Sequence, residues 1–198
     1  DVTEGSITLD GRDIRDITLE SLRENIGYVP QKGILFSGTI ADNIKYGQLA
    51  ESDEAMLEAA EIAQATEFIE TKPDKYASPI AQGGNNVSGG QKQRLSIARA
   101  IARDPMIYIF DDSFSALDFK TDAALRKALA PKVKDKTVFI VAQRISTVMH
   151  AEQIIVLDDG KVAGIGTHKE LMENCEIYRQ IAGSQLSESE LRKSLEVE

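Results

Sequence analysis

The fold of this chain is decided by Val87-Ser88-Gly89-Gly90-Gln91-Lys92-Gln93-Arg94, a Gly-Gly turn at the start of a helical pattern. Apolar residues recur after it at helical spacing, at Leu95, Ala98, Ile101 and Ala102. Glycines at the start of such a helix leave backbone N–H groups and the positive end of the helix dipole without side chains in front of them. The stretch therefore predicts a seat for an anion such as a phosphate.

A second stretch, Ile107-Tyr108-Ile109-Phe110-Asp111-Asp112, predicts a buried parallel strand that ends in carboxylates. Open α/β sheets place their ligands at the carboxyl ends of such strands. We therefore expect Asp111 to bind Mg²⁺, directly or through water. Alone, a Ser-Gly-Gly turn is usually only a loop before a helix, and a terminal aspartate is usually a solvated strand end or a cap. Found together in this order, the two stretches favour a nucleotide site.

With these motifs the chain resembles the ATP-binding domain of ABC transporters, specifically of the exporter type. The matching segments are Val87–Arg94 for the signature, Ile107–Asp111 for Walker B, Ser115–Asp118 for the D-loop, Tyr28–Gln31 for the Q-loop, and Leu35–Ile44 for the exporter-like segment after it. The resemblance extends from Gly5 to about Ile181. It implies that the chain binds ATP and Mg²⁺.

The resemblance also implies a fold and a set of site residues. The expected fold is α/β, a P-loop NTPase-like and mostly parallel sheet with an inserted helical subdomain. The expected parts are a partial nucleotide-binding domain at 1–183, with its helical subdomain at about 49–103, and a charged C-terminal tail at 184–198. The implied residues are Asp112 and Gln143 for catalysis, Gln31 and Asp111 for the metal, and Gln31, Ser88, Gly89, Gly90, Gln91 and Asp118 for ATP.

One family element is missing from the sequence. The phosphate loop with its lysine and Ser/Thr precedes the first strands in the family, and no Gly-Lys-Ser or Gly-Lys-Thr occurs here. Because the chain starts at Asp1 without methionine, we expect a truncated domain whose first strands and phosphate loop are missing. The rival explanation is a natural protein that lacks the loop. In either case we expect the isolated chain to bind ATP poorly and to be inactive.

The second departure lies at the chemistry. Active family members have a glutamate directly after the Walker B aspartate and a histidine in the switch region, where this chain has Asp112 and Gln143. The aspartate carboxylate is one methylene shorter, and a general base must be placed accurately. Glutamine can donate a hydrogen bond but carries no proton or charge. We therefore expect this site to hydrolyse ATP slowly or not at all, losing roughly the 10²- to 10⁴-fold of a general base.

In the family, two such domains pack head to tail, so the signature of one completes the ATP site of the other. This chain therefore resembles the degenerate half of a heterodimeric multidrug exporter, with a second nucleotide-binding domain and transmembrane coupling helices as partners. We expect it at the cytoplasmic face of the cell membrane. The apolar runs are shorter than the roughly 20 residues that span a bilayer, so the piece itself is expected to be soluble.

Two other functions remain open at this point. One is a non-hydrolytic module in which ATP only joins two domains. The other is a soluble ABC ATPase of DNA repair or translation, against which the segment after Gln31 weighs. The net charge of −9 argues against nucleic acid as a partner. We interpret the basic residues Lys92, Arg94, Arg99 and Arg103 as a solvated helix face near phosphate.

The remaining pattern predicts further elements by residue range. The helical predictions are a short helix from Thr18, a helical stripe at 52–70, a helix at 122–130 ended by Pro131, a capped helix from Thr167 to about Ile181, and a frayed helix at 187–198. The strand predictions are a first strand and turn at residues 7–11, strands at 26–29 and 137–142 (the latter buried), and a hairpin at 153–164. We expect His168 at the surface and Cys175 as a small buried residue.

Overall fold

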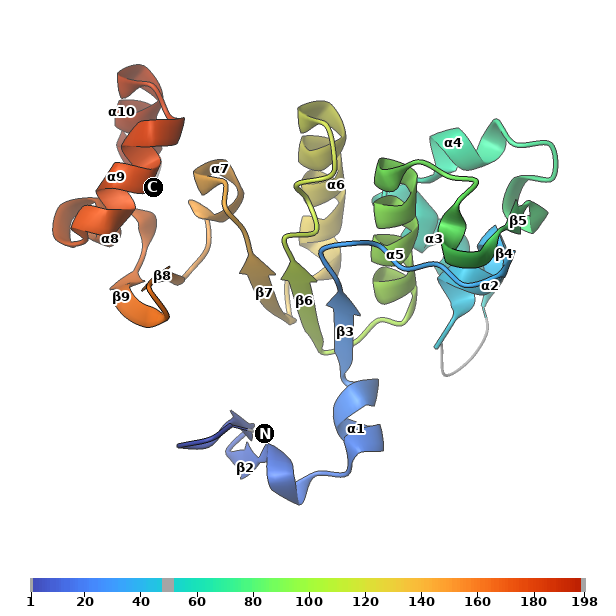
Figure 1. Cartoon of the computed structure of the whole chain (residues 1–198), viewed down its shortest axis with the longest axis horizontal. Helices are drawn as coiled ribbons and strands as arrows, with labels where there is room; N and C mark the ends of the chain where they lie inside the picture. The colour runs from blue at the N-terminus through green and yellow to red at the C-terminus, as the bar shows by residue number, and fades with distance from the viewer. Residues whose placement is uncertain (1, 48–51, 197–198) are drawn as a thin grey trace. The chain divides into compact units, whose positions relative to one another are not determined.

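Three parallel strands form the sheet that carries Asp111: β3 (Ile26–Val29), β6 (Ile107–Asp111) and β7 (Thr137–Val141), in the order β3-β6-β7 (Figure 1). In the register of the sheet, Tyr28 lies opposite Ile109 and Ile109 lies opposite Phe139. Because the strands are parallel, their carboxyl ends lie at one edge. The predicted α/β fold with a parallel sheet is confirmed.

The structure is a computed structural model that describes residues 2–47 and 52–196. The chain divides into two compact units, Asp1–Val141 and Ala142–Glu198. The first residues predicted for the helical subdomain, 49–51, and the end of the predicted tail, 197–198, lie outside the described residues. Within the described ranges, no helix combines the length and the apolar character needed to cross a membrane.

Helix α5 (Gly89–Ala102) is the central helix of the first unit. Leu95, Ile97 and Ala98 are fully buried, and α5 packs against β3, α2 and α3. The other helices of this unit are α1 (Leu19–Glu24), α2 (Ile40–Lys45), α3 (Asp53–Ile62), α4 (Thr66–Glu70) and α6 (Phe119–Lys132), with the 3₁₀ helices η1 (Ile14–Asp16), η2 (Lys75–Ala77) and η3 (Gln82–Gly84). Two short antiparallel pairs complete the unit: β1 (Thr8–Leu9) with β2 (Arg12–Asp13), and β4 (Gly38–Thr39) with β5 (Pro79–Ile80).

Two helices of the first unit differ from the sequence prediction. The stripe at 52–70 is broken after α3, because Gln64 has a left-handed backbone (φ 57°) and its side-chain amide bonds the Glu61 carbonyl at 3.1 Å. Helix α6 begins earlier than predicted and continues past Pro131 to Lys132. Pro131 lies in the last turn and cannot donate to the carbonyl four residues earlier, and the helix ends one residue after it.

Strand β7 is not buried as predicted. The side chains of Phe139 and Val141 are 55% and 56% exposed, whereas Val138 and Ile140 pack against the main core. Alternate residues of a strand point to opposite faces of the sheet. In the described part of the chain, only one face of β7 packs into the core, so an apolar run does not establish burial on both faces.

The arginines along α5 do not form a solvated face. Arg99 donates to the Asn43 carbonyl (2.8 Å), the Asn43 side-chain oxygen (2.9 Å) and the Ile34 carbonyl (2.9 Å). Its guanidinium also lies over the rings of Phe36 and Tyr46. The fork of five donors on arginine suits this role, since it can bond two backbone segments at once. The interpretation as a solvated face is therefore wrong.

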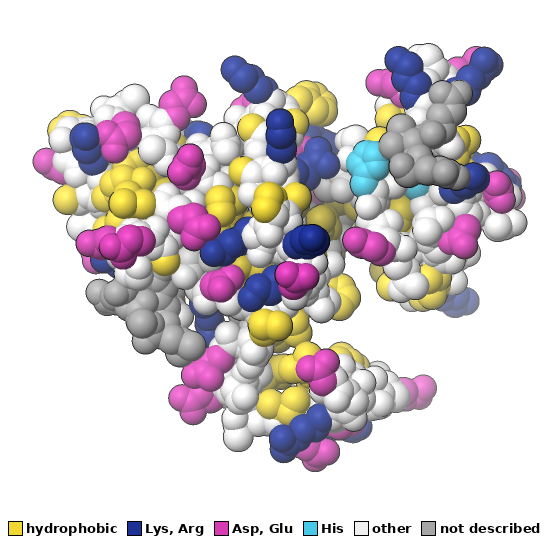
Figure 2. Space-filling view, turned by 180° about the vertical axis from the view of Figure 1, so that it is seen from behind, with side chains coloured by type: hydrophobic (Ala, Val, Ile, Leu, Met, Phe, Trp, Pro, Cys, Tyr) yellow, Lys and Arg dark blue, Asp and Glu magenta, His cyan; other side chains and the backbone are white. Residues whose placement is uncertain are grey.

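Arg94 of α5 and Arg103, the C-cap residue of this helix, also bond backbone carbonyls. Arg94 donates to the Gln64 carbonyl at 2.7 Å and lies over the Phe68 ring, and Arg103 donates to the Arg23 carbonyl at 2.7 Å. On the molecular face in Figure 2, Lys and Arg side chains are interspersed with Asp and Glu side chains.

We expect Arg99→Lys to destabilise the first unit by about 2–4 kcal/mol. Lysine keeps the charge but can reproduce neither the three directed bonds nor the stacking, and hydrogen bonds from charged groups contribute about 1.5–3 kcal/mol each. Equilibrium urea unfolding measures the difference. The matched control is Lys120→Arg at the exposed start of α6, which should change the unfolding midpoint little; an equal midpoint for Arg99→Lys would contradict the assignment.

The described residues of the second unit form the predicted hairpin and four helices. The hairpin pairs β8 (Ile154–Asp158) with β9 (Lys161–Gly166). The helices are α7 (Ile145–Val148), α8 (His168–Asn174), α9 (Glu176–Gln185) and α10 (Glu188–Glu196). Cys175 is buried as predicted, but it joins α8 to α9 with an extended backbone, so the expected helix to Ile181 is two helices.

His168 is buried, so the predicted surface position is wrong. Its Nδ1 atom lies 2.8 Å from the Tyr178 hydroxyl oxygen, and its Nε2 atom lies 2.9 Å from the Ser194 hydroxyl oxygen. Burial lowers the pKa of His168, and His150 lowers it further. A capping box of Thr167 and Glu170 forms where the capped helix was predicted to begin. Ser194, the second hydrogen-bond partner of His168, lies on α10, 26 residues later in the chain.

Candidate functional site

The N-terminus of α5 has little side-chain bulk in front of it. Ser88 caps the helix: its hydroxyl accepts from the Gln91 N–H (3.2 Å), and the Gln91 side chain accepts from the Ser88 N–H (3.0 Å). A Cβ added at Gly89 would meet no atom within 4 Å outside its own helix backbone and chain neighbours. The side chains of Ser88 and Gln91 are thus used for capping, and the open space lies at Gly89.

The D-loop lies beside this helix end. A Cβ on Gly90 would lie 3.5 Å from the Ala116 carbonyl oxygen. Asp118 caps α6, accepting from the Thr121 N–H at 2.9 Å and the Thr121 hydroxyl at 2.7 Å. These bonds hold the pKa of Asp118 below its usual value. The geometry therefore gives Asp118 a capping role, and its contact with ATP stays a prediction.

Three predicted site residues meet at the carboxyl ends of β3 and β6. Gln31 donates from Nε2 to an Asp112 carboxylate oxygen at 3.2 Å. Tyr28 donates from its hydroxyl to the neighbouring Asp111 carboxylate at 3.0 Å, and this bond is the main cause of a raised pKa of Tyr28. The contacts join residues 81 and 83 positions apart in the sequence. The strand order places Gln31, Asp111 and Asp112 in one cluster.

Tyr28 is the member of this cluster that sequence reasoning missed as a site residue. It lies on β3 opposite Ile109, two residues before Asp111 on β6. Residues two apart share a face of a strand, so Tyr28 and Asp111 are placed on the same face. The pairing register of β3 and β6 shows that Tyr28 lies near Asp111. The sequence alone predicts only that residues 26–29 form a strand.

The turn after β6 is held from both sides. Asp112 has a left-handed backbone (φ 45°), and its N–H donates to the Val141 carbonyl at 2.8 Å. The fully buried Ser113 donates its hydroxyl to the Val29 carbonyl at 2.8 Å. Aspartate adopts the left-handed region more readily than most residues do. The two strands beside β6 therefore fix the direction in which the Asp112 side chain leaves the backbone.

Asp111 and Gln31 suit a magnesium ion that is completed by phosphate and water. Among residues 2–47 and 52–196, no group of three or more His, Cys, Asp or Glu side chains could hold a metal alone. Mg²⁺ is normally bound by one or two carboxylates together with waters and substrate phosphates. One carboxylate and one amide oxygen at a strand edge fit that requirement, and they do not fit a structural metal site.

Gln143, the second predicted catalytic residue, belongs to the second unit and lies between β7 and α7. Its backbone carbonyl accepts a hydrogen bond from the side chain of Gln185 at 2.8 Å, and the residue itself is exposed. The first unit thus brings together Gln31, Asp111 and Asp112, three of the predicted catalytic and metal residues. Gln143 belongs to the second unit. Gln185 was not predicted, because its partner lies 42 residues away.

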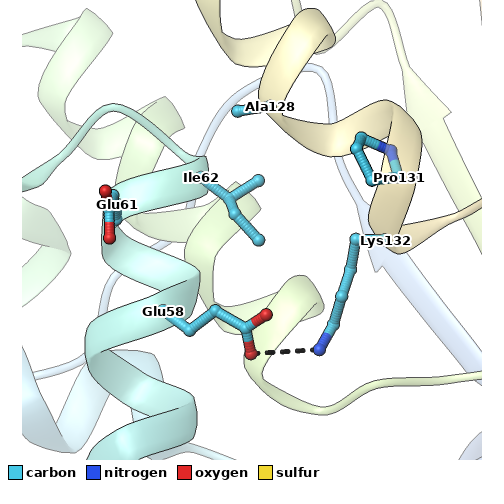
Figure 3. A pocket seen from close by; sticks show the side chains of 6 residues that line it. All are labelled: Glu58, Glu61, Ile62, Ala128, Pro131 and Lys132. Atoms are coloured by element: carbon cyan, nitrogen blue, oxygen red, sulfur yellow. Dashed lines mark hydrogen bonds and ion pairs between the residues drawn. The ribbon is translucent and has the colours of Figure 1, made fainter.

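A pocket of about 360 Å³ lies between α3 and α6 (Figure 3). Its lining residues are Glu58, Glu61, Ile62, Ala128, Pro131 and Lys132. Lys132 closes one side by donating to Glu58 at 3.1 Å. None of these residues belongs to a predicted motif, so this pocket is not the candidate ATP site.

Comparison with known proteins supports the same family. The family model "ABC transporter" matches residues 1–115. An uncharacterized ABC transporter ATP-binding protein of Mycobacterium tuberculosis is 47% identical over 188 residues, which is 93% of this chain and 32% of that protein. A Staphylococcus aureus ATP-binding/permease protein, provisionally named for multidrug export, is 43% identical over 181 residues, 91% of this chain and 31% of that protein. The chain thus spans about a third of the length of these relatives.

A solved structure extends the comparison to the fold. The structure of a bacterial Atm1-family ABC exporter with ATP bound superposes with a TM-score of 0.91 at 36% identity, covering 95% of this chain and 33% of that chain. The family model, the relatives and this superposition agree with one another. This chain therefore belongs to the ABC transporter family, and its fold is that of the nucleotide-binding domain of an ABC exporter.

Proposed function

We propose that this chain is the ATP-driven part of an exporter in which it completes the ATP site of a partner domain while its own site hydrolyses slowly. The observation that carries the proposal is the capped N-terminus of α5, with open space at Gly89. A helix N-terminus without side chains in front of it binds phosphate through backbone N–H groups and the helix dipole. The signature is therefore suited to serve a nucleotide.

The slow site is inferred from Asp112 and Gln143. The Asp112 carboxylate is already bonded by Gln31, and its side chain is one methylene shorter than that of the glutamate to which the family resemblance points. A base must lie within hydrogen-bond reach of the water that it activates. Gln143 can bond a γ-phosphate oxygen but brings no positive charge to it. Both differences weaken hydrolysis at the same site.

ATP with Mg²⁺ is the proposed fuel, and the bound ion would neutralise charge on the transferring phosphoryl group. Asp111 and Gln31 would hold the ion, and Tyr28 orients Asp111 through its hydroxyl. The proposed partners are a second, different nucleotide-binding domain and the coupling helices of a transmembrane domain, at the cytoplasmic face of the membrane. The name of the Staphylococcus aureus relative supports drug-like molecules as cargo.

The test is steady-state ATP hydrolysis by the full-length transporter subunit that carries this domain, alone and then co-purified with its partner subunit. We expect little activity alone and strong activity together. Equal activity in both preparations would refute the asymmetric pairing. An inactive pair that still dimerises with ATP would instead identify a non-hydrolytic regulatory module.

A further inference from the structure

In the second unit, one side chain bonds the backbone on both sides of Arg144. Gln185, the last residue of α9, accepts from the Ile145 N–H through Oε1 at 2.9 Å and donates through Nε2 to the Gln143 carbonyl at 2.8 Å. The chemistry fixes the orientation of this amide, because an N–H can bond only its oxygen and a carbonyl can bond only its nitrogen. Gln185 therefore clamps the segment 143–145.

This segment depends on support from elsewhere in the unit. Helix α7 has only four residues, and its N-cap residue Arg144 makes no side-chain cap hydrogen bond. The first N–H groups of a helix have no partner within the helix, and a helix this short is not stable alone. Gln185 supplies the missing acceptor from another helix. The packing of Ile145, which is only 3% exposed, holds the same turn from inside.

Helix α9, which carries Gln185, is held in place by its packing in the second unit. Tyr178 and Ala182 of α9 are buried in the same cluster as Ile145. The Tyr178 hydroxyl also bonds the buried His168 of α8. The packing of α9 thus sets the position of the Gln143 backbone. The position of the Gln143 side chain depends on that backbone.

We propose that Gln185 is a positioning residue that fixes Gln143 for contact with the γ-phosphate. This inference rests on the proposed function, in which Gln143 occupies the position next to that phosphate. Gln185 acts on Gln143 only through the Gln143 backbone carbonyl. Its loss should therefore weaken recognition of the γ-phosphate and leave recognition of the rest of the nucleotide unchanged.

The clamp is tested by amide hydrogen exchange in the assembled transporter. Gln185→Leu should raise the exchange rate of the Ile145 amide by about 3- to 10-fold, the range expected for one hydrogen bond. Gln185→Glu keeps the acceptor and should preserve that protection. The matched control is Gln180→Leu, on the same helix, where the native side chain donates to Glu176 at 3.3 Å. Equal exchange in Gln185→Leu and Gln180→Leu would overturn the proposal.

The functional role is tested by competition of ATP and ADP against 8-azido-ATP photolabelling of this subunit. Gln185→Leu should reduce the preference for ATP over ADP by about 3- to 10-fold and leave ADP affinity unchanged. Gln185→Glu should show the same loss, because it lacks the donor to Gln143. An unchanged preference, or an equal loss of ATP and ADP affinity, would overturn the proposal. Neither readout depends on turnover, so rapid hydrolysis at this site would refute only the proposed slow site.

Discussion

Gly89→Asp should abolish ATP hydrolysis at the partner's site, reducing turnover there by about 10²- to 10³-fold, the loss seen when one donor to a transition-state oxyanion is removed. The site in question lies at the N-terminus of α5, where the capped glycine turn is open. A carboxylate there would occupy the phosphate position and repel the phosphate charge. Partner-site turnover is measured by single-turnover hydrolysis in the assembled transporter.

Loss of folding would not explain this result. A Cβ at Gly89 meets no atom within 4 Å, and an acidic residue in the first turn stabilises a helix by about 0.3–1 kcal/mol. Gly89→Asn, of the same size without the charge, should lose less activity. Gly183→Asp is the matched control, because Gly183 is also helical and open. Full turnover in a folded Gly89→Asp variant would show that the signature does not contact phosphate.

Asp112→Glu combined with Gln143→His should raise turnover at this chain's own site by about 10²- to 10⁴-fold, the contribution of a positioned general base. Under the proposed function, the carboxylate of a glutamate would extend one methylene further toward the attacking water, and histidine would bring the γ-phosphate a positive charge that glutamine lacks. The measurement is single-turnover hydrolysis in a transporter whose partner site has been silenced.

The backbone adds a cost to the first substitution. Asp112 has a φ of 45°, and a residue other than Gly, Asn or Asp in the left-handed region is less stable by about 1–2 kcal/mol. The double variant should therefore unfold slightly earlier while it hydrolyses faster. Asp112→Asn with Gln143→His is the matched control and should stay inactive, because it removes the base. Unchanged turnover in the Asp112→Glu double variant would mean that another feature silences the site.

The local elements could be predicted because their signals lie within a few residues. The Gly-Gly turn and the apolar spacing after it indicated α5, and the apolar run before Asp111 indicated β6. The capping box of Ser88 and Gln91 also has a sequence signal, Ser-x-x-Gln, which could have identified the capping bonds of both side chains. Phosphate binding at Gly89 stays a prediction from the same stretch.

The errors came from burial and from contacts between distant segments. The sequence predicts His168 at the surface, but Ser194 of α10 bonds its ring in the structure. The sequence likewise predicts Arg99 as a solvated charge, but its guanidinium bonds Asn43 and the Ile34 carbonyl. Strand β7 has the composition of a buried strand, but three of its five residues are exposed. Neighbours that are remote in sequence decide burial, and a local apolar pattern does not contain them.

The sequence by itself determined the chemistry of the candidate site: an aspartate at 111, a shorter acid at 112, an amide at 143, and glycines at the start of a helix. Only the tertiary structure decided which of these groups touch. The register of β3 on β6 brings Tyr28 to Asp111, and the packing of α9 brings Gln185 to the backbone of Gln143. The physical reason is that side-chain identity is local, whereas hydrogen-bond partners depend on strand register and helix packing across many tens of residues.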